Sequence, residues 1–177
     1  LIAKQNEKDV SKKLKEKEEK DNKEKAEKDL IIKNEVLPLI GRKFALMRTE
    51  YNGFDNAGEP FHFTQPASSL QESYSCGSTS TQEPPETCYN PKFLMINSKK
   101  EAVINGKLLA KISLYKGSMD KGYSVMFLVP NPAKPNYSTA VLSGRISFQG
   151  GQLSVRNLWT SKEGKTSETI SYFEEIK

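Results

Sequence analysis

The sequence has little of the residue types that build most catalytic and metal sites. Its 177 residues include one histidine, His62, and two cysteines, Cys76 and Cys88. A zinc site needs ligands at close, paired spacing, which these three positions do not provide. Catalysis by a histidine also needs an orienting acid and a nucleophile, and the only Asp residues after the first 35 positions are Asp55 and Asp120. We therefore predict a protein with no catalytic residues, no metal and no cofactor.

Long apolar runs are missing as well. No stretch approaches the ~20 apolar residues that a membrane helix requires, so we predict no transmembrane segment. The chain begins with Leu1 and not with methionine. An export signal or a lipid-bearing cysteine upstream of Leu1 would fit this start, and so would a simple fragment boundary.

The charge pattern argues against binding to nucleic acid. The net charge is +5, and residues 1–35 hold eleven Lys but also ten Asp or Glu. Acids so closely matched to the lysines cancel the positive field that a phosphate backbone requires. The remaining Lys and Arg are scattered and form no cluster with interleaved aromatic residues.

Residues 1–37 form the first of two regions and contain no Gly, Pro or aromatic residue. Several acids lie four positions before a lysine, an arrangement that stabilises an isolated helix. Val10 and Leu14 begin an apolar stripe, but Asp21 and Lys28 interrupt it and exclude a sustained coiled coil. We predict a solvated helical spacer of about 45 Å, or alternatively a helix that orders on a partner. Leu30, Ile31, Ile32, Val36 and Leu37 should dock on the rest of the protein, and Pro38 and Gly41 should end the helix.

Residues 38–177 read as short β-strands separated by turns. The expected strands are 41–51, 59–63, 92–97, 101–104, 107–115, 123–129, 138–148, 152–160 and 166–176. Asn105-Gly106 between two apolar runs predicts a type I′ hairpin, whereas the three prolines of 130–136 exclude regular structure there. So many sequential strands favour an antiparallel up-and-down β-barrel or a strongly bent sheet, because closure removes exposed edges. A two-sheet sandwich is the alternative.

The architecture expected is similar to that of the lipocalins. Gly41-Arg42-Lys43-Phe44 lies where lipocalins often place a G-x-W motif at the entry to the first strand, but the tryptophan is missing. This resemblance implies a barrel that holds a small apolar ligand. Phe44, Phe127, Phe148 and Trp159 are expected to point inward, and such large side chains favour a filled interior.

The long polar stretch 64–91 is the strongest candidate for a binding region. Cys76 and Cys88 flank its Pro-rich part and should form a disulfide, which would place the protein in an oxidising compartment; two unrelated buried thiols are the alternative. Loops this long are usually functional or disordered, and tyrosine provides contact area at low entropic cost. The predicted binding residues are Tyr74, Tyr89, Pro84, Pro85 and, in the second Pro-rich loop, Tyr137. A variable surface loop without a partner is the plainer interpretation.

Together these features favour a non-catalytic, exported binding protein of the bacterial periplasm or cell surface. It would recognise another protein through the loops of its β domain, as an inhibitor, immunity protein or envelope assembly factor does. The alternative function is that of a lipocalin-like carrier of a small apolar ligand.

Overall fold

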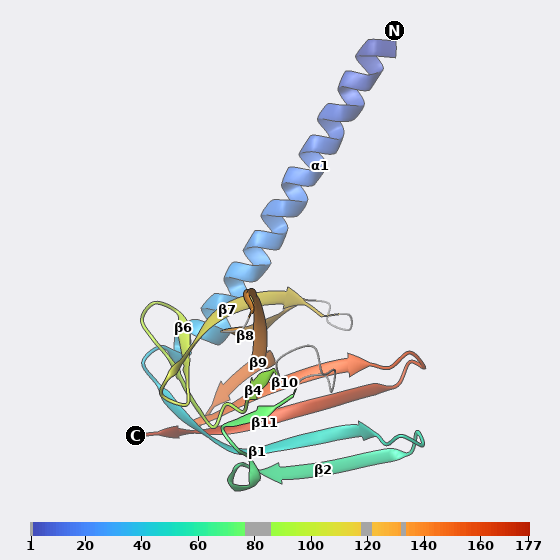
Figure 1. Cartoon of the computed structure of the whole chain (residues 1–177). Helices are drawn as coiled ribbons and strands as arrows, with labels where there is room; N and C mark the ends of the chain where they lie inside the picture. The colour runs from blue at the N-terminus through green and yellow to red at the C-terminus, as the bar shows by residue number, and fades with distance from the viewer. Residues whose placement is uncertain (1, 77–85, 118–121, 132–133) are drawn as a thin grey trace.

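The computed structural model describes residues 2–76, 86–117, 122–131 and 134–177, and shows a long helix standing on a β-barrel (Figure 1). Its helical elements are α1 (Ile2–Ile31), the π-helical turn η1 (Ile32–Val36) and the 3-10 turns η2 (Leu37–Leu39) and η3 (Ala67–Ser69). The strands are β1 (Lys43–Phe54), β2 (Pro60–Pro66), β3 (Ser73–Ser75), β4 (Thr87–Tyr89), β5 (Phe93–Ile96), β6 (Glu101–Ile104), β7 (Leu108–Lys116), β8 (Tyr123–Asn131), β9 (Lys134–Gln149), β10 (Gln152–Thr160) and β11 (Thr166–Ile176).

Eight of the strands in the described residues close into an antiparallel barrel. The order is β1-β5-β6-β7-β8-β9-β10-β11, and β11 pairs with β1 over Lys43–Asn52 to complete the ring. The predicted up-and-down barrel is confirmed, and the open sheet and the sandwich are excluded. The predicted turn at Asn105-Gly106 is also confirmed, since both residues have positive φ, as a type I′ turn requires. The paired residues Ile104 and Leu108 are separated by three residues, one more than the two-residue connection expected.

The barrel interior is filled by side chains. Phe44, Phe127 and Phe173 are fully buried, and Phe148 is partly buried against them. The core cluster consists of Val36, Leu39, Phe44, Leu46, Leu94, Ile96, Ala102, Ile104, Ala110, Val125, Phe127, Val129, Leu142, Ile146, Leu153, Val155 and Phe173. The prediction for Trp159 was wrong: its side chain is 37% exposed and lies outside this cluster, because β10 continues past the part of the barrel that the other strands close.

The turns after α1 seal one end of the barrel. Val36 and Leu39 are buried in the core cluster. Glu35 accepts hydrogen bonds from Nε of Arg145 at 2.8 Å and from the backbone N–H of Ile146 at 3.0 Å. These groups are accessible because β9 leaves β8 at Gly144 and pairs with β10 from there on. The carboxylate of Glu35 thus accepts a hydrogen bond from a backbone N–H of β9 that lies beyond the pairing of β9 with β8.

The helix α1 stands away from the barrel over most of its length (Figure 1). Residues 7–23 are all exposed, and Glu24 and Lys28 are the first whose exposure drops. Leu30 remains 57% exposed and Leu37 is exposed too, so these two parts of the predicted docking segment were wrong. The prediction is confirmed for Ile31, Ile32 and Val36. Leu39 joins them in packing on the barrel core.

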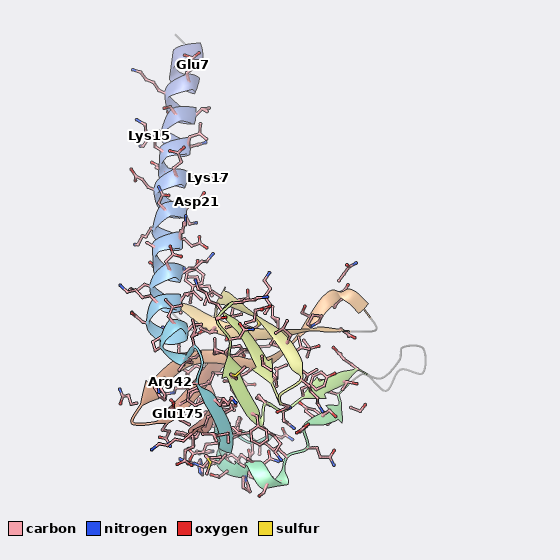
Figure 2. All side chains as sticks on the ribbon, turned by 90° about the vertical axis from the view of Figure 1, so that its left-hand side faces the viewer. Glu7, Lys15, Lys17, Asp21, Arg42 and Glu175 are labelled. Atoms are coloured by element: carbon pink, nitrogen blue, oxygen red, sulfur yellow. A yellow bond between two sulfur atoms is a disulfide. The ribbon has the colours of Figure 1, made fainter. Side chains whose placement is uncertain are left out.

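The pairing places α1 and the β3-β4 pair at opposite ends of the barrel. The segment that follows η2, the turn 97–100, the turn 150–151 and the C-terminus lie at the end that receives the helix, which we call the helix end. The turns 105–107 and 161–165, the β3-β4 pair and the junction of β8 with β9 lie at the other end, the loop end. Figure 2 shows β3, β4 and the β8-β9 junction on the side away from α1.

Three barrel strands continue beyond the barrel and form a four-stranded extension with β2, which we call the leaf. It consists of 48–54 of β1, all of β2, 156–160 of β10 and 166–170 of β11, in the order β2-β1-β11-β10. One edge of β1 pairs with β5 over Lys43–Ala45 and then with β2 over Arg48–Phe54. A bulge between Leu46 and Arg48 separates the two pairings.

The Pro-rich segment 130–136 is more regular than its composition suggested. β8 runs through Pro130 to Asn131, and β9 begins at Lys134, where we expected no strand. Pro130 pairs with Ser138, next to a register irregularity. Proline is compatible with a strand at such irregular positions, where no ladder donor is needed.

Candidate functional site

The predicted disulfide is confirmed and closes a small hairpin at the loop end. Cys76 and Cys88 are bonded, with 5.7 Å between their Cα atoms. Cys76 directly follows β3, and Cys88 lies within β4, where it is paired with Tyr74. The predicted binding residues Pro84 and Pro85 lie outside the described residues.

Polar contacts fix the base of this hairpin to the barrel. The side chain of Asn90 donates to the carbonyl oxygen of Gln71 at 2.6 Å, and Asn105 donates to the carbonyl oxygen of Asn90 at 2.9 Å. Tyr89 packs against the barrel core, so it belongs to this base, whereas Tyr74 is exposed. Of the two tyrosines that flank the disulfide, Tyr74 is the one available to a partner.

The second predicted loop lies beside the first. Oγ1 of Thr139 on β9 donates to Oε1 of Glu86, two residues before Cys88, at 3.3 Å. Tyr137 lies on the same strand two residues before Thr139 and is 68% exposed. The fold therefore brings the two stretches that the sequence singled out to one end of the barrel.

The sequence analysis missed a second surface, on the leaf. Trp159 of β10, Tyr51 of β1, and Phe61 and Phe63 of β2 form a continuous line of rings, which we call the aromatic row. Successive ring centroids are 5.9, 6.0 and 6.5 Å apart. Phe61 is 46% and Phe63 48% exposed. Such a connected exposed patch is unusual in a soluble domain and is typical of a binding surface.

Strand register explains why these rings share one face. Tyr51 pairs with Phe63 and Gly53 with Phe61, while Trp159 pairs with Ser167 across β10 and β11. Directly paired residues point to the same side of a sheet. This side is the one that carries the core residues inside the barrel, so the aromatic row continues the interior face beyond the barrel.

Gly53 lets the ring of Tyr51 lie along the strand. A Cβ atom at Gly53 would be 2.8 Å from Cζ of Tyr51 and 2.5 Å from Oγ of Ser167. The hydroxyl of Tyr51 donates to the carbonyl oxygen of Phe54 at 3.2 Å. The tip of the ring therefore covers the place of the missing side chain, as aromatic rings do where they compensate for a glycine in a sheet.

A pocket of about 490 Å³ opens where the aromatic row meets the tips of the two leaf hairpins. Tyr51, Phe54 and Trp159 form its aromatic wall, and Asn56 and Glu163 lie among its exposed polar residues. Nζ of Lys165 donates to the carbonyl oxygen of Gly58 at 2.8 Å and lies 4.7 Å from the centroid of the Phe54 ring. This contact joins the β1-β2 turn to the β10-β11 turn. We call the cavity the hairpin pocket.

The opposite face of the leaf is polar. Arg156 binds Glu168, which accepts a hydrogen bond from the side chain of Asn52 at 3.1 Å. Oδ1 of Asn52 contacts Nδ1 of His62, whose Nε2 is 3.2 Å from Oγ1 of Thr64. His62 is thus part of a polar ladder that crosses four strands, and it points away from Phe61 and Phe63 as alternation predicts.

The outer edge of the leaf offers few backbone donors. The backbone N–H of Asp55 donates to the carbonyl oxygen of Glu59, so the odd-numbered residues of β2 are the ones whose backbone groups bond to β1. The even-numbered positions from Pro60 to Pro66 therefore turn their backbone outward. Because proline has no N–H, both ends of this edge are protected against pairing with another strand.

A further contact holds α1 against β8. Glu24 is hydrogen-bonded to Tyr123, which raises the pKa of Tyr123 to about 12, and the same bond together with Lys28 lowers the pKa of Glu24. Nζ of Lys28 also lies 4.9 Å from the centroid of the Tyr123 ring. The contact between α1 and the barrel therefore begins at Glu24.

Among the described residues no three His, Cys, Asp or Glu side chains gather as metal ligands would. The described helices include none with the length and apolar character needed to cross a membrane. Comparison with protein-family models, with curated proteins and with solved structures finds no match to this chain.

Proposed function

We propose that this protein is a non-catalytic, exported binding protein that recognises another protein at the loop end of its barrel. The observation that carries the proposal is the contact between Glu86 and Thr139. It joins the disulfide-closed hairpin to the β8-β9 junction, so that exposed tyrosines from two segments distant in sequence stand at one end. Tyrosine on a rigid scaffold is common at protein interfaces.

The position of α1 supports this interpretation. The helix attaches at the end opposite the hairpin and is exposed over residues 7–23. A spacer placed there would hold the barrel away from an upstream anchor and leave the loop end accessible. A disulfide is stable in an oxidising compartment, and this is compatible with the proposed location in the periplasm or at the cell surface of a bacterium.

The small-ligand alternative finds less support. The interior-facing side chains Phe44, Phe127 and Phe173 are fully buried and occupy the space that a lipocalin-like ligand would need. A native mass measurement on protein purified from its own host would contradict this interpretation if it showed a bound lipid.

Photo-crosslinking in the bacterial envelope would test the loop-end proposal. A photoreactive residue is placed at Tyr74 or Tyr137 of the full chain, and as a matched control at Lys99, which is exposed in the turn 97–100 of the helix end. We expect a discrete protein adduct from the two loop-end positions, suppressed by excess unlabelled protein but not by the Tyr74→Ser/Tyr137→Ser variant. Equal adducts from Lys99, or none from any position, would refute the proposal.

A further inference from the structure

We propose that the aromatic row and the hairpin pocket together bind a saccharide chain. This site lies on the leaf and involves neither the disulfide hairpin nor Tyr137, so it is independent of the protein-binding function proposed above. Three features support this assignment: the exposed rings, the polar side chains beside them and the hydrogen bond that Lys165 in the pocket already makes to Gly58.

The rings provide a stacking surface. The tip of the Tyr51 ring lies over Gly53, with Trp159 on one side and Phe61 on the other, and the planes of these two rings are tilted against it by 37° and 49°. The face of an aromatic ring is negative and attracts the weakly positive C–H groups that cover one face of a pyranose. Neighbouring centroids are 5.9–6.5 Å apart, which is close to the length of one sugar unit in an extended chain.

The pocket provides hydrogen-bonding groups at one end of this surface. The amide of Asn56 and the carboxylate of Glu163 are exposed at its rim, and both can bond to hydroxyl groups. An apolar ligand would bury these groups without partners, which is costly. A sugar has both an apolar face for the rings and a polar edge for the rim.

An organic cation fits less well. Aromatic sites for quaternary ammonium groups enclose the charge between ring faces. Here Lys165 already lies over the ring of Phe54, and its ammonium is bound to the carbonyl oxygen of Gly58. The centroids of Tyr51 and Trp159 are 5.9 Å apart, which leaves no room for a charged group between the two rings.

The site has dimensions suited to a chain of several units. One end of the ligand would occupy the hairpin pocket against Trp159, and further units would pass over Tyr51 to Phe61 and Phe63. The leaf is held in shape by Lys165 at its tip and by the polar ladder on its other face. A prearranged surface of this kind loses little entropy when it binds.

The single tryptophan makes the test direct, because all tryptophan fluorescence comes from Trp159. The full chain is applied to an array of defined glycans. It is then titrated with monosaccharides and with tetrasaccharides of glucose and of N-acetylglucosamine while the emission is followed. We expect a saturable change with at least one saccharide class, and tighter binding of the tetrasaccharide than of its monosaccharide.

Matched variants locate the site. Phe63→Ser should weaken binding of the tetrasaccharide by about tenfold. Phe93→Ser, which alters a phenylalanine of equal exposure (47% against 48%) on β5, should leave it unchanged. Circular dichroism of both variants checks whether they are folded. The proposal would be overturned if the protein responded to no glycan, or if both variants lost binding equally. It would also be overturned if a protein that bound nothing on the array bound a peptide through the aromatic row.

Discussion

The helix and the barrel of this protein are held by different forces. In α1, residues 7–23 are exposed, and the contacts along it are local pairs such as Lys12 with Glu16 and Glu24 with Lys28. In the barrel, buried apolar side chains from every strand meet in one cluster. Surface ion pairs contribute little to stability, whereas burial of apolar area contributes most of it. The two regions should therefore respond very differently to mutation.

The largest difference is expected between a core residue and a residue of the exposed helix. Phe127→Ala should lower the free energy of unfolding by about 3–5 kcal/mol, because it opens a cavity in a packed interior. Leu14→Ala, at a side chain that is 56% exposed, should change it by less than about 0.5 kcal/mol. Chemical denaturation of both variants measures this contrast, and a comparable loss from Leu14→Ala would show that the helix is packed against something.

An intermediate effect is expected where the two regions join. Glu35→Gln replaces a largely buried carboxylate that binds Arg145 and the backbone of Ile146, and should cost about 1–3 kcal/mol. Glu19→Gln, on the exposed part of α1, is the matched control and should cost almost nothing. Equal thermal stability of the two variants would mean that Glu35 does not hold the junction.

The smallest effect is expected from shortening the helix. Removal of residues 1–23 should leave the free energy of unfolding within about 0.5 kcal/mol of its original value, because these residues bury little. Removal of residues 1–29 also takes away Glu24 and should return the pKa of Tyr123 toward its ordinary value. Ultraviolet titration of the phenols distinguishes the two forms.

The pH dependence of this contact follows from the sign of the shift. The folded pKa of Tyr123, about 12, lies above its ordinary value of 10.0. Between the acidic range in which Glu24 becomes protonated and about pH 10, the contact with Glu24 therefore adds its full stability, and this contribution is lost as the pH rises through about 12. A truncated protein without residues 1–29 should lack this component, and an identical alkaline titration of both proteins would contradict the assignment.

Local sequence signals predicted the elements well where one residue type has one conformational role. Asn105-Gly106 specified its turn through positive φ, and Cys76 and Cys88 formed the expected bond. Prediction failed where neighbours decide the outcome. Trp159 looks like a core residue by alternation, but β9 stops pairing with β10 at Arg156, so nothing in the described residues covers it as the core covers Leu153.

The aromatic row could have been suspected from two local signals. Phe61 and Phe63 alternate in a short strand that ends in proline, which marks an edge strand. Gly53 interrupts a strand pattern, which marks a close approach of another group. Neither signal shows that Trp159, about a hundred positions later, completes the row, because that depends on the pairing of β1 with β11.

The sequence by itself determined the charged helix, the antiparallel strands, the turn at Asn105 and the cysteine pair, because each depends on residues close together in the chain. The tertiary structure alone decided which inward-facing side chains are buried and which stand beyond the barrel. It also decided that Glu35 would meet Arg145 and that rings from three strands would align. Alternation fixes the face on which a side chain lies, but only the closure and register of the sheet fix what lies opposite that face.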